Sequence, residues 1–174
     1  MTFQDFLNEI QKCIDNKCYI ASLTMALMIP DICGKALFPK DETGKRYKKW
    51  YTQYIGDYYY NNFNNNSDID KASWMNEDLI YSLRCCMLHE ALPTIKKKDI
   101  IVKENKIDVF EIQFTDSAIF FCSDISTKGN GIKERKMSIN AKTLSEQLLG
   151  CGTDFYNDHK KEIDNEYSTI VRKN

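Results

Sequence analysis

The sequence predicts a mainly α-helical bundle with a small antiparallel β insert before its last helix. Apolar residues recur at spacings of three and four through most of 1–92 and again through 141–171, which is typical of packed helices. Between these regions, 107–139 contains short apolar runs bounded by turn residues, as strands do. A length of 174 residues suits one domain over 1–174, with a four-helix core in 1–92, the β insert in 107–139 and one or more C-terminal helices in 141–171.

The first two predicted helices have contrasting apolar patterns. Thr2 is a suitable N-cap for the first helix. The apolar residues of this helix form one stripe: Phe3, Phe6, Leu7, Ile10, Cys13 and Ile14. The second helix, about 18–29, is apolar on nearly all sides and is therefore predicted to be the central buried helix. Pro30 is predicted to end or kink it, and an exposed loop is expected over 34–44.

A third helix, rich in aromatic residues, is predicted over 45–60, and its first residues are basic. Positive charge at a helix N-terminus opposes the macrodipole, so this end is either a solvated face or a surface for a partner. The candidate RNA-binding residues are Lys45, Arg46, Lys48 and Lys49. After an Asn-rich loop over 61–70, Asn76 and the two acidic residues that follow it predict the start of a fourth helix, which runs to about Ala91.

The apolar pattern changes after the fourth helix. Short strands are predicted over 109–114, 118–122 and 135–139, and turn residues at 115–117 separate the first two. These strands predict a small antiparallel sheet. Asn140 or Ala141 is expected to open the last helix, with an interruption at Gly150-Cys151-Gly152 and a continuation over 155–170.

Composition excludes several classes of protein. With 24 basic and 25 acidic residues, the formal net charge is −1, so RNA contact requires a local patch rather than a basic domain. The seven cysteines include no C-x-x-C pair, so they predict neither a zinc site nor a disulfide framework, and no metal or cofactor is expected. The N-terminus lacks the features of a signal peptide, and the apolar stretch 19–29 is about half of the ~20 residues that a membrane span needs. A soluble, cytoplasmic protein with no membrane contact is predicted.

One segment of the fourth helix, 83–89, places Arg84 and His89 five residues apart within an apolar pattern. On a helix they lie about 140° apart around the axis, but the long arginine can reach back toward the histidine. His89 shares a stripe with Ser82, Cys85 and Cys86, while leucines and Met87 pack the other faces. The pair is therefore predicted at the edge of a buried helix, where an imidazole is shielded and still reaches a cleft.

The spacing Arg84-x4-His89, late in the fourth helix of a helical domain, resembles the R-x(4–6)-H motif of HEPN domains. These small helical bundles occur in toxin–antitoxin, CRISPR and phage-defence systems, and many are metal-independent ribonucleases. The resemblance implies that Arg84 and His89 are catalytic, that Ser82, Cys85 and Glu90 support them, and that two chains form a composite site as a homodimer. It also implies a cognate antitoxin or defence protein as a partner. Active members usually carry Asn, Asp or His directly after the arginine, where this chain has Cys85.

These residue types suit RNA cleavage, because RNA carries its own nucleophile in the 2′-OH. Histidine exchanges protons near neutral pH, and arginine binds phosphate oxygens with two donors. The expected products are a 2′,3′-cyclic phosphate and a 5′-hydroxyl. Cys85 and the near-zero net charge favour the alternative of a non-catalytic HEPN-like module that binds RNA, a nucleotide or a partner protein. A structural dimerisation domain without a ligand is the third hypothesis.

Three other features have both a structural and a functional interpretation. Asp31, after Pro30, either forms a turn or meets the fourth helix. His159 lies in a charged stretch and is predicted to be a solvated helix residue. The tyrosines at 58–60 either belong to a core or an interface, or stack on bases.

Overall fold

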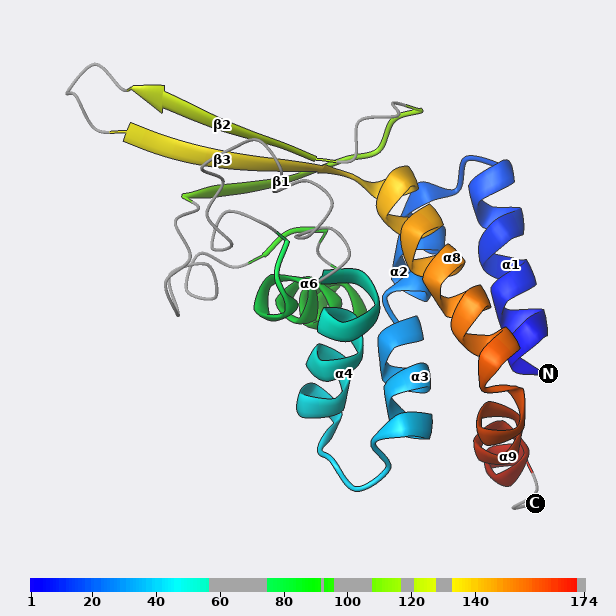
Figure 1. Cartoon of the computed structure of the whole chain (residues 1–174). Helices are drawn as coiled ribbons and strands as arrows, with labels where there is room; N and C mark the ends of the chain where they lie inside the picture. The colour runs from blue at the N-terminus through cyan, green and yellow to red at the C-terminus, as the bar shows by residue number, and fades with distance from the viewer. Residues whose placement is uncertain (57–74, 92, 96–107, 117–120, 128–132, 172–174) are drawn as a thin grey trace.

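The computed structural model describes residues 1–56, 75–91, 93–95, 108–116, 121–127 and 133–171, and only the backbone in 121–127, 133–135 and 167–171. It confirms the predicted class, because most of the described chain is helical and a small sheet precedes the last helices. The helices form one group, and the sheet extends away from it on one side (Figure 1). The predicted loop at 61–70 and the tyrosines at 58–60 lie outside the described residues.

The first helix, α1 (Phe3–Asp15), forms as predicted. Thr2 caps it with a complete capping box, in which the Thr2 hydroxyl accepts from the Asp5 backbone N–H and the Asp5 carboxylate accepts from the Thr2 N–H. The predicted apolar stripe is buried, apart from the half-buried Cys13. It faces α2 (Tyr19–Ala26) and α8 (Ala141–Asp158), which both contact α1.

The predicted second helix is two helices, which corrects the sequence analysis. α2 ends at Ala26, and α3 (Ile29–Leu37) begins after Met28 with Pro30 in its first turn. Proline is tolerated in this position because the first N–H groups of a helix have no partner within the helix. Pro30 therefore starts a helix rather than ending one, and α3 occupies the first part of the predicted loop 34–44. The predicted four-helix core in 1–92 accordingly holds five α-helices among its described residues.

The stretch Tyr19–Leu37 is the one candidate membrane span found among the described residues, by length and apolar composition. The core helix of a soluble protein and a signal sequence near an N-terminus both meet the same criteria. In this fold the stretch is divided between α2 and α3, and 44% of its most apolar window is buried inside the protein. A soluble protein is consistent with this arrangement.

The third predicted helix begins two residues earlier than expected, as α4 (Thr43–Tyr51), and continues as a π-helical turn, η1 (Thr52–Gly56). α3 and α4 lie side by side in Figure 1 and contact each other. Gly34 makes this close packing feasible, because a Cβ added there would lie 2.8 Å from the backbone carbonyl oxygen of Arg46. The close approach fixes α3 against the N-terminal half of α4.

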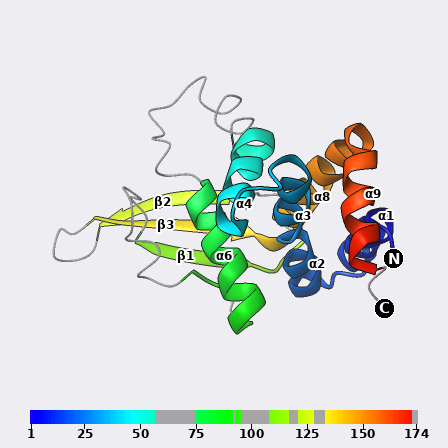
Figure 2. The same cartoon turned by 90° about the horizontal axis from the view of Figure 1, so that it is seen from below.

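The fourth predicted helix, α6 (Glu77–Glu90), has the predicted boundaries. The Asn76 side chain caps it by accepting from the backbone N–H groups of Asp78 and Leu79. It ends at Ala91, whose φ of 54° places it in the left-handed region that often closes helices. α6 contacts α4, and in Figure 2, seen from below, it lies in front of the sheet.

The sheet contains β1 (Val109–Gln113), β2 (Phe121–Thr127) and β3 (Lys133–Asn140) in the order β1-β3-β2. β2 and β3 pair antiparallel as predicted, but β1 pairs with β3 in parallel. The prediction of a purely antiparallel sheet is therefore wrong. After β1 the chain crosses to the far edge of the sheet, so the last strand occupies its centre. The alternation of apolar and polar residues along one strand does not show which distant strand it pairs with, or in which direction.

The last predicted helix is continuous through the glycines that were expected to interrupt it. α8 begins at the Asn140 cap and runs to Asp158, and the chain breaks at His159 before α9 (Lys160–Val171). Gly152 faces Ile29 of α3, because a Cβ added at Gly152 would lie 2.6 Å from the Ile29 Cγ2. Gly152 thus serves helix packing rather than a turn.

The core lies between α8 and the helices α1 to α4. Trp50, Tyr47 and Phe155 are among its largest buried side chains. The ring of Trp50 meets Phe155 edge-on, with centroids 5.8 Å apart. α4 therefore presents one side to this core and leaves its other side for α6 and solvent.

Candidate functional site

The predicted pair on α6 lies where three helices meet, because α4 contacts both α3 and α6. Asp31 comes from the first turn of α3, Arg46 from α4, and Arg84 and His89 from α6. The two residues predicted to be catalytic thus share a site with two charged side chains from elsewhere in the chain.

Arg84 and His89 approach each other as the sequence predicts. An Nη1 atom of Arg84 lies 3.4 Å from the Nε2 atom of His89, which is a long hydrogen-bond distance. Guanidinium nitrogens only donate, so this contact requires Nε2 to accept and leaves the proton of a neutral imidazole on Nδ1. The Arg84 side chain is 15% exposed, whereas His89 is an exposed residue. The arginine is therefore set into the protein, and the histidine stands at the solvent boundary.

Asp31 links the two arginines. Its Oδ1 accepts hydrogen bonds from the Nε and Nη2 atoms of Arg46, at 3.0 and 2.8 Å. Its Oδ2 lies 3.5 Å from the Nη2 atom of Arg84. Of the two interpretations of Asp31, the contact with the fourth predicted helix is the one the structure confirms. Its place in the first turn of α3 also suits a carboxylate, because the helix dipole favours negative charge there.

The cluster carries more positive charge than negative, with two guanidinium groups and one carboxylate in direct contact. Two buried polar atoms, Arg84 Nε and Tyr47 Oη, have no hydrogen-bond partner within the described part of the chain. Burial also raises the pKa of Tyr47 well above its ordinary value, so its hydroxyl stays neutral. The Arg84 guanidinium stands 5.9 Å from the ring centre of Tyr81. Surplus positive charge of this kind suits an anionic ligand such as a phosphate.

The three predicted supporting residues have different surroundings. Cys85 is half-buried and lies one helical turn after Tyr81 on α6. Burial, and then the interaction with Cys85, raises the pKa of Tyr81. Ser82 is half-buried on the same helix, and Glu90 is exposed next to His89. Cys85 thus lies next to an aromatic residue one turn earlier in α6.

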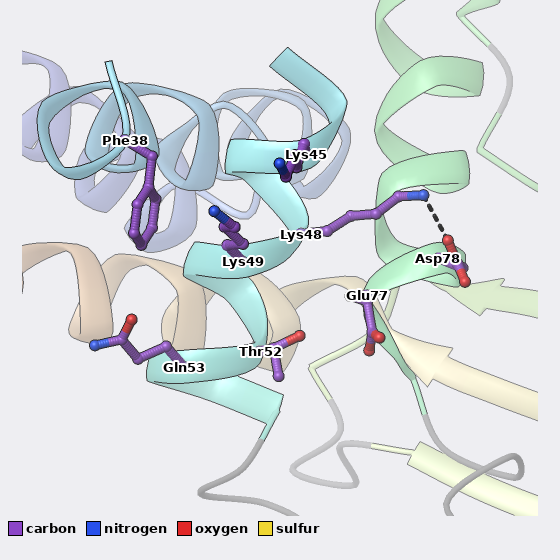
Figure 3. A pocket seen from close by; sticks show the side chains of 8 residues that line it. All are labelled: Phe38, Lys45, Lys48, Lys49, Thr52, Gln53, Glu77 and Asp78. Atoms are coloured by element: carbon purple, nitrogen blue, oxygen red, sulfur yellow. Dashed lines mark hydrogen bonds and ion pairs between the residues drawn. The ribbon is translucent and has the colours of Figure 1, made fainter. Parts of the chain in front are cut away.

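The predicted basic patch divides into two parts. Lys45, Lys48 and Lys49 line an open pocket of about 640 Å³ beside α4 (Figure 3), whereas Arg46 turns to Asp31. Glu77 and Asp78 of α6 line the same pocket, together with Phe38, Thr52 and Gln53.

The lysines of this pocket have acidic partners. The Lys48 ammonium lies 2.5 Å from Asp78, and Lys45 and Lys49 both pair with Asp41, which precedes α4. Lys49 and, next, Lys45 lower the pKa of the Asp41 carboxyl. These ion pairs explain how the start of α4 tolerates its basic run, and they leave little net charge in the pocket for a phosphate backbone.

The second histidine and the metal-binding potential of the chain complete the description of the candidate residues. His159 is half-buried and stacks on Phe155, with ring centres 4.4 Å apart, so the prediction of a solvated histidine is wrong. The signal missed was the apolar residue four positions earlier on α8. Among residues placed by the structure, no group of three or more His, Cys, Asp or Glu side chains is arranged to hold a metal ion.

Comparison of the chain with protein-family models, with curated proteins and with solved structures found no match. The resemblance to HEPN domains therefore depends on the spacing of Arg84 and His89 alone, because α6 is the fifth described α-helix rather than the fourth. The contacts of the cluster are the basis for the function proposed next.

Proposed function

We propose that the chain is a HEPN-like, metal-independent endoribonuclease that cleaves RNA through attack by the 2′-OH. The observation that carries the proposal is the 3.4 Å contact between a nearly buried Arg84 guanidinium and an exposed His89 imidazole. This places a fixed positive charge and a proton-transfer group next to each other at the protein surface. Both groups are what cleavage of a phosphodiester with an internal nucleophile requires.

In this reaction the Nε2 atom of His89 exchanges its 3.4 Å contact with Arg84 for the 2′-OH of the bound RNA and takes its proton, and the 2′ oxygen attacks the neighbouring phosphorus. The bond from phosphorus to the 5′ oxygen breaks, and that oxygen receives a proton from His89 or from its copy in a second chain. Arg84 neutralises charge that builds up on the non-bridging phosphate oxygens. The products are a 2′,3′-cyclic phosphate and a 5′-hydroxyl.

The proposed setting follows the same resemblance. The active form is a homodimer in the cytoplasm, in which the two copies of Arg84 and His89 form one composite site. A cognate antitoxin or defence protein is the proposed partner, and RNA is the substrate. The exposure of His89 supports this setting, because an exposed imidazole is accessible to a second chain or to an RNA strand.

The test is cleavage of labelled single-stranded and hairpin RNA by purified protein in EDTA. Wild type is expected to cut, and His89→Ala to lose at least a hundredfold in rate, consistent with loss of general acid–base catalysis. His159→Ala removes the other histidine of the chain and is the matched control, expected to retain activity. Absence of cleavage by wild type, or equal rates for wild type and His89→Ala, contradicts the proposal.

A non-catalytic module is the second candidate, favoured by the surroundings of Cys85. A half-buried thiol is a weak hydrogen-bond donor and acceptor, so Cys85 orients a phosphate or an imidazole less well than the Asn, Asp or His of active members. Such a module would bind RNA, a nucleotide or a partner protein through the same cluster. Binding of RNA that depends on Arg84, without turnover under any condition tested, distinguishes this candidate from the enzyme.

A further inference from the structure

We propose that Asp31 is a positioning residue of this site, whose carboxylate holds the Arg84 guanidinium against His89 and is itself anchored by Arg46. Its effect on catalysis rests on the ribonuclease function proposed above. Its effect on Arg84 depends only on contacts within the protein. Asp31 acts through Arg84 rather than on a substrate, because both of its oxygens already face arginines.

The backbone of α3 fixes where the carboxylate lies. Asp31 follows Pro30 in the first turn, and Gly34 packs directly against the Arg46 carbonyl. The distance from Asp31 to Arg46 is therefore set by two rigid helices rather than by a loop. The Arg46 side chain then donates twice to Oδ1, which orients the carboxylate and directs Oδ2 to α6.

Arg84 is held on two sides of its guanidinium. One terminal nitrogen faces Asp31 at 3.5 Å, and the other faces His89 at 3.4 Å. A free arginine side chain samples many rotamers, so a fixed carboxylate reduces the entropy lost when Arg84 takes its working position. Without that carboxylate, the nearby Arg46 charge would also repel Arg84. The negative charge of Asp31 is thus the property that holds Arg84 in position.

The first experiment needs no activity and uses the Nε–H and terminal NH₂ signals of the arginines in NMR. Arg46, Arg84, Arg135 and Arg172 are the arginines of the chain, and Arg46→Lys and Arg84→Lys assign the first two. Asp31→Asn keeps the shape and removes the charge. It is expected to shift the Arg84 signals and to speed rotation of its NH₂ groups several-fold.

The matched control is Glu166→Gln. Glu166 of α9 forms a 2.8 Å ion pair with Lys35 at the other end of α3, so this variant removes one carboxylate that contacts the same helix. It is expected to leave the Arg84 signals unchanged. Arg84 signals that are the same in Asp31→Asn and wild type overturn the inference. If near-UV circular dichroism shows that Asp31→Asn is unfolded, Arg46→Lys carries the same test, because it removes the Nε donor and keeps the charge.

The second experiment measures the consequence for cleavage. Asp31→Asn is expected to lower kcat by about 10–100-fold, with a smaller change in KM, as is usual when a group that orients a catalytic side chain is lost. In an Arg84→Lys background the same substitution is expected to have little further effect. Equal loss in both backgrounds indicates a purely structural role and overturns the inference. An inactive wild type contradicts the proposed function alone, and the NMR result then decides the role of Asp31.

Discussion

Gly150 and Gly152 lie two residues apart in α8, yet alanine is expected to have opposite effects at the two positions. Gly150 is exposed, and a Cβ there would meet no atom within 4 Å, so alanine gains about 0.5–1 kcal/mol of helix propensity. Gly152 is buried, and its Cβ would lie 2.6 Å from Ile29 Cγ2. Overpacking of this kind costs roughly 1–3 kcal/mol, which exceeds the propensity gain.

The difference between the two variants isolates the packing cost, because the propensity gain is common to both. Urea unfolding followed by circular dichroism is expected to place Gly152→Ala roughly 1–3 kcal/mol below Gly150→Ala. Ile29→Ala, combined with Gly152→Ala, should be less destabilising than the sum of the two single changes, since it removes the opposing methyl group. If Gly152→Ala is as stable as Gly150→Ala, α8 and α3 do not pack as closely as described.

Three further predictions concern stability. Hydrogen bonds from Lys17 and then Tyr19 lower the pKa of Asp116, so the stabilising effect of its carboxylate is present above pH ~4 and is lost as pH falls through the folded-state pKa. In urea titrations, the difference in unfolding free energy between wild type and Asp116→Asn should therefore shrink from pH 6 to pH 3. A difference that stays constant over this range would contradict this cause. Tyr47→Phe removes a buried hydroxyl that lacks a partner among the described residues, and is expected to raise the unfolding free energy by about 1 kcal/mol; a loss of stability in the same urea assay would mean that the hydroxyl is satisfied. Asn76→Ala removes the cap of α6 and should cost about 1 kcal/mol, measured against Asn76→Ser, which keeps a capping oxygen.

Local signals predicted the helix boundaries well where a cap was present. Thr2, Asn76 and Asn140 all cap the helices expected of them, because capping depends only on residues a few positions away. Pro30 starts a helix rather than ending one, and its sequence position alone does not decide this because proline fits both the end of one helix and the first turn of the next. The parallel pairing of β1 and β3 was also missed, because strand order depends on the path of the chain between strands.

The candidate site was predictable only in part, for a similar reason. Arg84 and His89 belong to one helix, so their spacing was sufficient to expect an approach. The roles of Asp31 and Arg46 depend on the packing of α3 against α4 and α6, which no local pattern specifies. The basic residues at the start of α4 do not form one patch, because neighbouring residues on a helix point about 100° apart and Arg46 faces a different side from Lys45.

The most direct test of the Arg84–His89 site is the chemical nature of the RNA ends that the protein produces. Mass spectrometry of fragments from an RNA incubated in EDTA is expected to show 2′,3′-cyclic phosphates and 5′-hydroxyls, absent with His89→Ala and absent when the RNA carries 2′-O-methyl groups. Fragments that end in 5′-phosphates, or continued cleavage of the 2′-O-methylated strand, would contradict attack by the 2′-OH at this pair.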